Sequence, residues 1–150
     1  RVARSNIWAH AHLGNEVRLI GPRTLLPADF MQEFPGKISI HHSLSEGLAG
    51  VDVIICLRLQ LERQNNFFIP STQEYTNEFF ISQKILDANA AKGYVVMHPG
   101  PINRGVEVET KLIDSSASLV EKQVAAGLAV RMACLFRACQ KDEVNSEESK

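Results

Sequence analysis

Apolar and polar positions along the chain follow two periods, one typical of short strands and one typical of helices. Four short runs rich in Val and Ile are bounded by Gly, Pro or charged residues, which predicts strands. The predicted strands are 16–20 (EVRLI), 37–41 (KISIH), 51–57 (VDVIICL) and 94–98 (YVVMH). Between them, apolar residues at helical spacing and Gly or Pro breakers predict helices. The predicted helices are 1–13, 28–34, 43–48, 82–90 and 119–140.

Strands that alternate with helices are typical of an α/β fold, a doubly wound parallel sheet flanked by helices. We expect one domain over residues 1–140 and a charged, disordered tail over 141–150. Residues 64–80 are predicted to form a long loop with a helical turn near 72–77. Because the chain opens with a helix and has only four predicted strands, we expect that a strand upstream of Arg1 has been lost or lies on another chain.

The last predicted helix carries a long apolar stripe. Its members recur at helical spacing and are Val120, Val124, Leu128, Met132 and Leu135. The stripe is longer than one face of a small sheet needs, so we expect part of it to be unsatisfied within this chain. Burial of the whole stripe within its own domain is the alternative.

Composition narrows the class of protein. The 150 residues are 45% hydrophobic and 22% charged, which is ordinary for a folded domain of this length. Sixteen Lys and Arg against seventeen Asp and Glu give a net charge of −1, which argues against broad nucleic-acid or membrane-surface binding. No apolar run approaches the roughly 20 residues that span a bilayer. Disordered, fibrous, membrane-spanning and disulfide-rich classes are thereby excluded.

Cysteines and histidines do not predict a metal site. The three cysteines each lie in an apolar stretch and are expected to be small buried residues in a reducing compartment: Cys56, Cys134 and Cys139. His10 and His12 lie about 200° apart around a helix and cannot share one metal. His41 and His42 are neighbours at a strand end and point to opposite faces.

The first candidate site follows the strand 51–57. In open parallel sheets, ligands bind beyond the carboxyl ends of the strands. Arg58 and Gln60 alternate there, so an extended backbone presents both from one face. Arginine offers a planar fork for a carboxylate, and Glu62 is placed to hold the guanidinium. A surface cluster of salt bridges that closes the strand is the alternative.

The second candidate site follows the strand 94–98. His98, Pro99, Gly100 and Pro101 form a rigid turn in which neither proline has an N–H to donate. Such a turn presents carbonyl oxygens, which accept hydrogen bonds from an amide or amine, and His98 either polarises a group or caps the strand. A purely structural turn is the alternative. A glycine-rich GxGxxG loop is absent from the sequence, so a nucleotide cofactor has no support.

Four segments in order resemble the aspartate carbamoyltransferase catalytic chain: RVARSN at the start, LRLQLER, MHPGPINRGVEV and QVAAGLAVRMACL. The resemblance covers essentially all 150 residues, but only the carboxyl-terminal, aspartate-binding half of that family's chain. The related ornithine enzymes carry a His-Cys-Leu-Pro turn where this chain has HPGP and fit poorly. The resemblance implies that the strand missing before Arg1 is the first, central strand of the sheet.

The resemblance also implies roles for individual residues. Arg1 would bind the α-carboxylate of L-aspartate, and Arg58 the β-carboxylate. Gln60 would lie nearby, and Glu62 would steady Arg58. The backbone carbonyls of the HPGP turn would accept from the amide of carbamoyl phosphate, with support from His98; they belong to Pro99, Gly100 and Pro101.

The implied reaction transfers the carbamoyl group of carbamoyl phosphate to the amine of L-aspartate, as in pyrimidine biosynthesis, without metal or organic cofactor. The implied partners are an amino-terminal carbamoyl-phosphate domain, two further copies in a homotrimer or a multiple of it, and possible regulatory or other pathway chains. Nucleic acid and membrane are not implied, and the location expected is cytoplasmic. We expect this chain alone to be inactive. A non-catalytic amino-acid-binding or assembly module derived from the family is the alternative.

Overall fold

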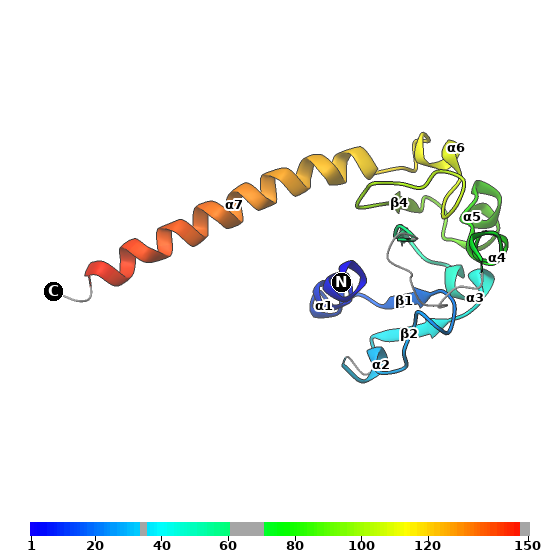
Figure 1. Ribbon diagram of the computed structural model, residues 1–150, viewed down its shortest axis with the longest axis horizontal. Helices are drawn as coiled ribbons and strands as arrows, with labels where there is room; N and C mark the ends of the chain where they lie inside the picture. The colour runs from blue at the N-terminus through cyan, green and yellow to red at the C-terminus, as the bar shows by residue number, and fades with distance from the viewer. Residues whose placement is uncertain (34–35, 61–70, 148–150) are drawn as a thin grey trace.

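The computed structural model describes residues 1–33, 36–60 and 71–147. Figure 1 shows short strands interspersed with helices, and one long helix that leaves the body. The helices are α1 (Val2–His12), α2 (Phe30–Glu33), α3 (Leu44–Leu48), α4 (Thr72–Phe79), α5 (Gln83–Asn89), α6 (Thr110–Ile113) and α7 (Val120–Glu147). The strands are β1 (Val17–Ile20), β2 (Ile38–His41), β3 (Val53–Ile55) and β4 (Val95–Met97).

Most predicted elements are confirmed with shorter bounds, and three predictions need correction. The segment 72–79 is an eight-residue helix, α4, where only a helical turn was expected. Ser71 caps it by accepting from the backbone N–H of Glu74 at 3.0 Å, a capping signal that the polar composition of the segment obscured. The short helix α6 was not predicted. The backbone of α7 continues to Glu147, so its expected end near Gln140 was too early.

The strands form two parallel pairs. Val17 to Ile20 of β1 lie opposite Ile38 to His41 of β2, and Val53 to Ile55 of β3 lie opposite Val95 to Met97 of β4. β1 and β3 do not pair with each other. A groove of about 580 Å³ lies between them, lined by residues of both strands and of α1. The predicted α/β class is confirmed, and the division of the sheet into two halves agrees with a domain that lacks its central strand.

Helices cover both faces of the β1–β2 pair, as a doubly wound fold requires. On one face, Ile7 of α1 packs with Ile38 and with the partly buried Val17 and Leu19. On the other face, Ile20 contacts α3, where a Cβ at Gly47 would lie 2.5 Å from Ile20 Cγ1. Only glycine allows this close approach of helix to strand.

The larger core lies around the β3–β4 pair. It gathers residues from α3, β3, α5, β4 and the segment around α6, and its most buried members are Leu48, Leu86, Val96, Val108 and Leu112. Leu119 N donates to Val96 O at 2.8 Å, which joins the start of α7 to β4. The carboxyl ends of β3 and β4 are therefore held by a well-packed base.

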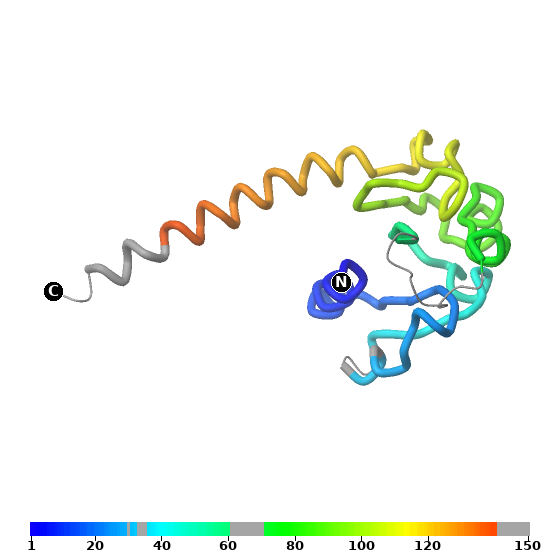
Figure 2. The backbone as a smooth tube through the Cα atoms, viewed as in Figure 1, coloured from blue at the N-terminus to red at the C-terminus, as the bar shows by residue number. Residues whose placement is uncertain are grey.

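Helix α7 has 28 residues and so is about 42 Å long. Its first turn contacts the body, and the rest projects away from it (Figures 1 and 2). The apolar stripe is exposed along this length, from 53% at Val124 to 68% at Leu135. The expectation that part of the stripe is unsatisfied is thereby confirmed. Of the described helices, none is long and apolar enough to cross a bilayer.

The exposure of α7 corrects one prediction about the cysteines. Cys56 is buried as expected, but Cys134 and Cys139 are exposed. Both lie on the part of α7 that projects from the body, where no described residue packs over them.

Candidate functional site

The two candidate segments leave the sheet side by side. β3 and β4 are parallel neighbours, and Cys56 N donates to Met97 O at 2.9 Å just beyond the paired residues. The chain then continues into Arg58 on one strand and His98 on the other. The rule that ligands bind beyond the carboxyl ends of parallel strands thus brings both segments to one edge.

Arg58 is anchored by a residue from the second segment. The backbone after β3 alternates as predicted, with Leu59 only 5% exposed and Gln60 exposed. Arg58 is partly buried, and its Nε donates to Asn103 Oδ1 at 3.3 Å. Asn103 Nδ2 in turn donates to the backbone carbonyl of Leu59 at 3.0 Å. One asparagine side chain therefore joins the Arg58 segment to the loop that follows the HPGP turn.

The HPGP turn has a buried base and an exposed rim. His98 is fully buried, whereas Pro99, Gly100 and Pro101 are exposed. His98 Nδ1 accepts from Gly100 N at 2.9 Å, and the backbone N–H of His98 donates to Gln123 Oε1 of α7 at 2.9 Å. His98 thus holds the turn from below, which is the capping role that the sequence left open.

Beneath the turn lies a buried carboxyl group. Glu107 is 2% exposed, and its Oε1 accepts from the backbone N–H of Asn103 at 2.6 Å. The same oxygen lies 3.4 Å from His98 Nε2. Burial lowers the pKa of His98 below its ordinary value, and the attraction of Glu107 only partly offsets that effect. At neutral pH the imidazole is therefore uncharged.

Two other titratable groups near this carboxyl are kept protonated. Burial raises the pKa of the Cys56 thiol to about 12, with a smaller contribution from Glu107. Burial and the same carboxyl raise the pKa of Tyr75 to about 12. Neither side chain is suited to nucleophilic or base catalysis at neutral pH.

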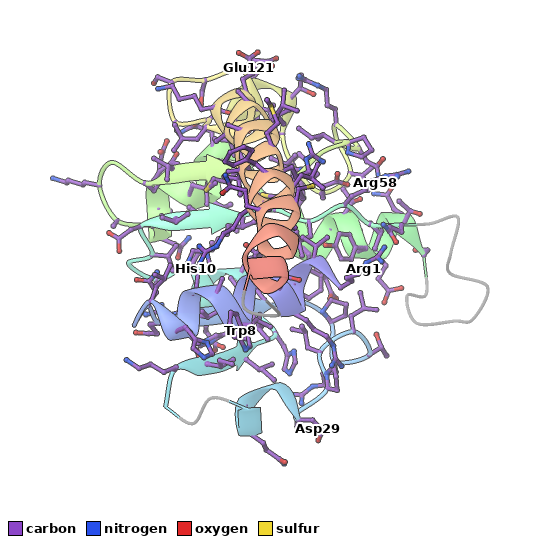
Figure 3. All side chains as sticks on the ribbon, turned by 90° about the vertical axis from the view of Figure 1, so that its left-hand side faces the viewer. Arg1, Trp8, His10, Asp29, Arg58 and Glu121 are labelled. Atoms are coloured by element: carbon purple, nitrogen blue, oxygen red, sulfur yellow. The ribbon has the colours of Figure 1, made fainter. Side chains whose placement is uncertain are left out.

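The remaining predicted residues are placed differently. Arg1 is exposed at the start of α1, where its backbone carbonyl accepts from Ser5 N at 3.1 Å. Figure 3 shows Arg1 and Arg58 on the same side of the molecule, Arg1 from α1 and Arg58 from the end of β3. Glu62, expected to steady Arg58, lies outside the described residues.

Sequence reasoning missed three residues of this site: Asn103, Glu107 and Gln123. Asn103 follows the end of a strand by a few residues, and so it meets the same criterion as His98, a polar side chain beyond the carboxyl end of a strand. Glu107 and Gln123 are single polar residues within largely apolar segments, so no local pattern marks them as part of a site. Among the described residues, no group of three or more His, Cys, Asp or Glu side chains is arranged to hold a metal ion.

An α/β fold with polar groups beyond the carboxyl ends of β3 and β4 is typical of a domain that binds a small-molecule ligand. Residues 1–137 match the family model for the Asp/Orn binding domain of aspartate/ornithine carbamoyltransferase, and the chain belongs to this family.

The chain is similar in sequence to curated aspartate carbamoyltransferases. The chain is 46% identical over 149 residues to the aspartate carbamoyltransferase catalytic subunit of Magnetococcus marinus, covering 99% of this chain and 44% of the relative. It is 49% identical over 135 residues to that of Bradyrhizobium diazoefficiens, covering 90% of this chain and 42% of the relative. The chain thus spans less than half the length of these relatives.

Solved structures agree on the fold. Aspartate transcarbamoylase from Trypanosoma cruzi, in complex with carbamoyl aspartate and phosphate, superposes with a TM-score of 0.64 at 26% identity over 80% of this chain and 39% of that one. Ornithine carbamoyltransferase from Pyrococcus furiosus superposes with a TM-score of 0.69 at 24% identity, covering 82% of this chain and 41% of that one.

Proposed function

We propose that this chain is the aspartate-binding half of an aspartate carbamoyltransferase that acts in pyrimidine biosynthesis in the cytoplasm. The α-amine of L-aspartate attacks the carbamoyl carbon of carbamoyl phosphate. The bond from that carbon to the phosphate oxygen breaks, the amine loses a proton, and N-carbamoyl-L-aspartate and phosphate leave. Catalysis comes from positioning and from stabilisation of charge in the tetrahedral intermediate, with no metal or organic cofactor.

The observation that carries the proposal is the contact between Arg58 and Asn103 at the edge shared by β3 and β4. It joins an arginine suited to a carboxylate with a turn whose exposed rim offers carbonyl oxygens. An amino-acid carboxylate and a carbamoyl amide need these two surfaces next to each other. The name of the curated relatives, aspartate carbamoyltransferase catalytic subunit, supports aspartate as the acceptor of a carbamoyl group.

The proposed roles follow from this layout. Arg58 binds the β-carboxylate of aspartate, with Gln60 beside it and Glu62 as a further support. Arg1, on the same side of the molecule, binds the α-carboxylate. The carbonyls of Pro99, Gly100 and Pro101 accept from the amide of carbamoyl phosphate, and His98 holds the turn that bears them.

We propose that residues 1–140 form the aspartate-binding domain and that its partner is an amino-terminal carbamoyl-phosphate domain. Two surfaces support such a partner. The groove between β1 and β3 is lined by residues of two strands that do not pair with each other, and such strand edges are where a further strand can add. The apolar stripe of α7 is exposed over several turns, beyond what monomers commonly leave uncovered.

Three copies are proposed to form a homotrimer, alone or as part of a larger assembly with regulatory or other pathway chains. Neither nucleic acid nor a membrane is a proposed partner. A non-catalytic amino-acid-binding or assembly module remains the second candidate. The enzyme is favoured because a protein that has lost catalysis commonly lacks one of the residues that bind substrate. This chain keeps all four of those proposed: Arg1, Arg58, Gln60 and His98.

The direct test is an assay of this chain together with the proposed amino-terminal domain, which we call the full-length protein. With L-aspartate and carbamoyl phosphate we expect stoichiometric N-carbamoyl-aspartate and phosphate. Ornithine in place of aspartate should give no product. Aspartate binding by calorimetry without any turnover would support the non-catalytic module instead.

A further inference from the structure

A continuous path of polar contacts runs beneath the candidate site, from Arg58 to the HPGP turn. Arg58 Nε donates to Asn103 Oδ1 at 3.3 Å, and Asn103 N donates to Glu107 Oε1 at 2.6 Å. Glu107 Oε1 lies 3.4 Å from His98 Nε2. His98 Nδ1 accepts from Gly100 N at 2.9 Å. The four contacts connect the proposed aspartate-binding arginine with the turn proposed to bind carbamoyl phosphate.

Burial of Glu107 at the centre of this path costs folding free energy. Glu107 is 2% exposed, and a buried carboxyl group destabilises a fold unless it is well paired. Among the described residues, Glu107 Oε2 and His98 Nε2 have no hydrogen-bond partner within normal geometry. An apolar side chain at position 107 would fill the same space without this cost. Packing alone therefore does not account for a carboxyl group here.

The protonation of His98 follows from its neighbours. Nδ1 accepts the Gly100 N–H, so the single proton of the neutral ring lies on Nε2. That nitrogen faces Glu107 Oε1. One carboxylate oxygen thus receives the backbone N–H of Asn103 from one side and faces the imidazole N–H on the other. Its position sets both the Asn103 backbone and the orientation of the His98 ring.

Asn103 transmits this position to Arg58 through both ends of its amide. Oδ1 accepts from the guanidinium, while Nδ2 donates to Leu59 O at 3.0 Å, on the backbone next to Arg58. A hydrogen bond at Nε fixes the plane of the arginine guanidinium. The pair of donors at its end, Nη1 and Nη2, does not include the atom that makes this hydrogen bond. Bidentate recognition of a carboxylate depends on that plane.

We propose that Asn103 and Glu107 are positioning residues that set the Arg58 guanidinium and the HPGP turn relative to each other. This inference rests on the proposed carbamoyltransferase function. Neither residue touches substrate. Asn103 acts on the aspartate side alone, whereas Glu107 acts on both sides because it contacts Asn103 and His98.

The test uses the full-length enzyme and steady-state kinetics for both substrates. Asn103→Ala should raise the KM for aspartate roughly tenfold or more, because the hydrogen bond that orients Arg58 at Nε is lost. Its KM for carbamoyl phosphate should change less than about threefold. Glu107→Ala should raise both KM values, and Glu107→Gln should restore most of the loss because its amide oxygen still accepts from Asn103 N.

The matched control is Arg104→Ala. Arg104 is the next residue on the same loop, and its exposed ion pair with Asp114, 3.0 Å between nitrogen and oxygen, does not involve the path. This variant should leave both KM values unchanged. A cycle of Asn103→Ala and Arg58→Ala separates positioning from general damage, since the effect of Asn103→Ala should disappear once Arg58 is gone.

The outcomes are distinguishable. If the wild-type enzyme shows no carbamoyl transfer, the proposed function fails. If the wild type is active and Asn103→Ala behaves like Arg104→Ala, or its effect persists unchanged in the Arg58→Ala background, the positioning inference is wrong. Should Glu107→Ala fail to fold, Asn103→Ala and the cycle decide alone.

Discussion

Arg58 shows how one side chain depends on a residue 45 positions away. Its place after a strand could be predicted from the local sequence, but the atom that orients it belongs to Asn103. Glu62 was the expected support and lies outside the described residues. At the scale of single residues, the role of an arginine follows from its chemistry, and its geometry follows from contacts distant in sequence.

We predict that Arg58→Ala in the full-length enzyme lowers kcat/KM for aspartate. The loss of transition-state stabilisation should be roughly 2–5 kcal/mol, because a charge-assisted contact with the carboxylate is lost. Arg58→Lys should recover little, since it keeps the charge and loses the fork. Aspartate saturation kinetics measure the effect, with Arg104→Ala as the control. An unchanged kcat/KM would remove Arg58 from the site.

We also predict a pH dependence of stability from His98. Burial lowers the pKa of this imidazole, so the unfolded chain takes up its proton at a higher pH than the folded chain does. The free energy of unfolding should therefore fall as the pH drops below about 6.5, by at most about 1.4 kcal/mol per pH unit from this group. Urea unfolding of the full-length protein between pH 8 and pH 5 measures the slope.

His98→Asn supplies the comparison, because its Oδ1 keeps an acceptor for Gly100 N and cannot take up a proton. The variant should show a shallower loss of stability toward acid than the wild type. Equal slopes in the two proteins would mean that His98 contributes nothing to the pH dependence.

Among the described elements, α7 leaves the largest part of its apolar surface exposed. Its apolar residues fit a helix that packs along its length, yet only its first turn contacts the body (Figure 1). Cys139 follows Leu135 by four residues and Met132 by seven, which places it on the apolar stripe. Cys134 lies about 140° around the helix from Cys139. The two thiols therefore report on different faces.

We predict that in the native full-length protein Cys139 is protected from alkylation while Cys134 reacts, because the partner domain covers the stripe. In the isolated 150-residue chain both should react. Cys56 should stay unmodified in both, since it is buried and its thiol pKa is about 12. Mass spectrometry after a brief iodoacetamide pulse gives the extent at each site.

Unfolding in urea is the control that makes all three thiols accessible. Equal reactivity of Cys134 and Cys139 in the full-length protein would contradict docking of the stripe.

At the scale of the whole molecule, the two half-sheets do not complete a domain. β1 and β3 each belong to a separate two-stranded sheet and face a common groove, and Val53 of β3 is 48% exposed. Strand edges and apolar surface of this kind favour aggregation. A further strand between β1 and β3, as proposed for the amino-terminal partner, would cover both edges.

We predict that residues 1–150 alone bind aspartate weakly, transfer no carbamoyl group and aggregate or fold loosely, whereas the full-length protein sediments as a trimer or a multiple of it. Adding the separate amino-terminal half should restore part of the activity. Sedimentation equilibrium and a product assay measure the two properties. Turnover by the isolated chain, or a fully active monomeric full-length enzyme, would contradict the prediction.

The sequence alone determined the alternation of strands and helices, the two polar segments at strand ends and the apolar stripe of α7, because each depends on residues close together in the chain. The resemblance in four short segments was confirmed by the family match over residues 1–137. Helix α4 was predicted only as a helical turn within a loop, because its polar composition obscured the Ser71 cap.

Only the tertiary structure decided how the four strands pair, which cysteines are covered and which residue contacts Arg58. Parallel strand pairing brings residues 58 and 98, which are 40 positions apart, to one edge, and periodicity carries no information about that pairing. The buried contact between Glu107 and His98 also depends on the packed base beneath the turn. Local pattern specifies which groups are available, and packing specifies which of them meet, because contacts distant in sequence form only when a core brings them together.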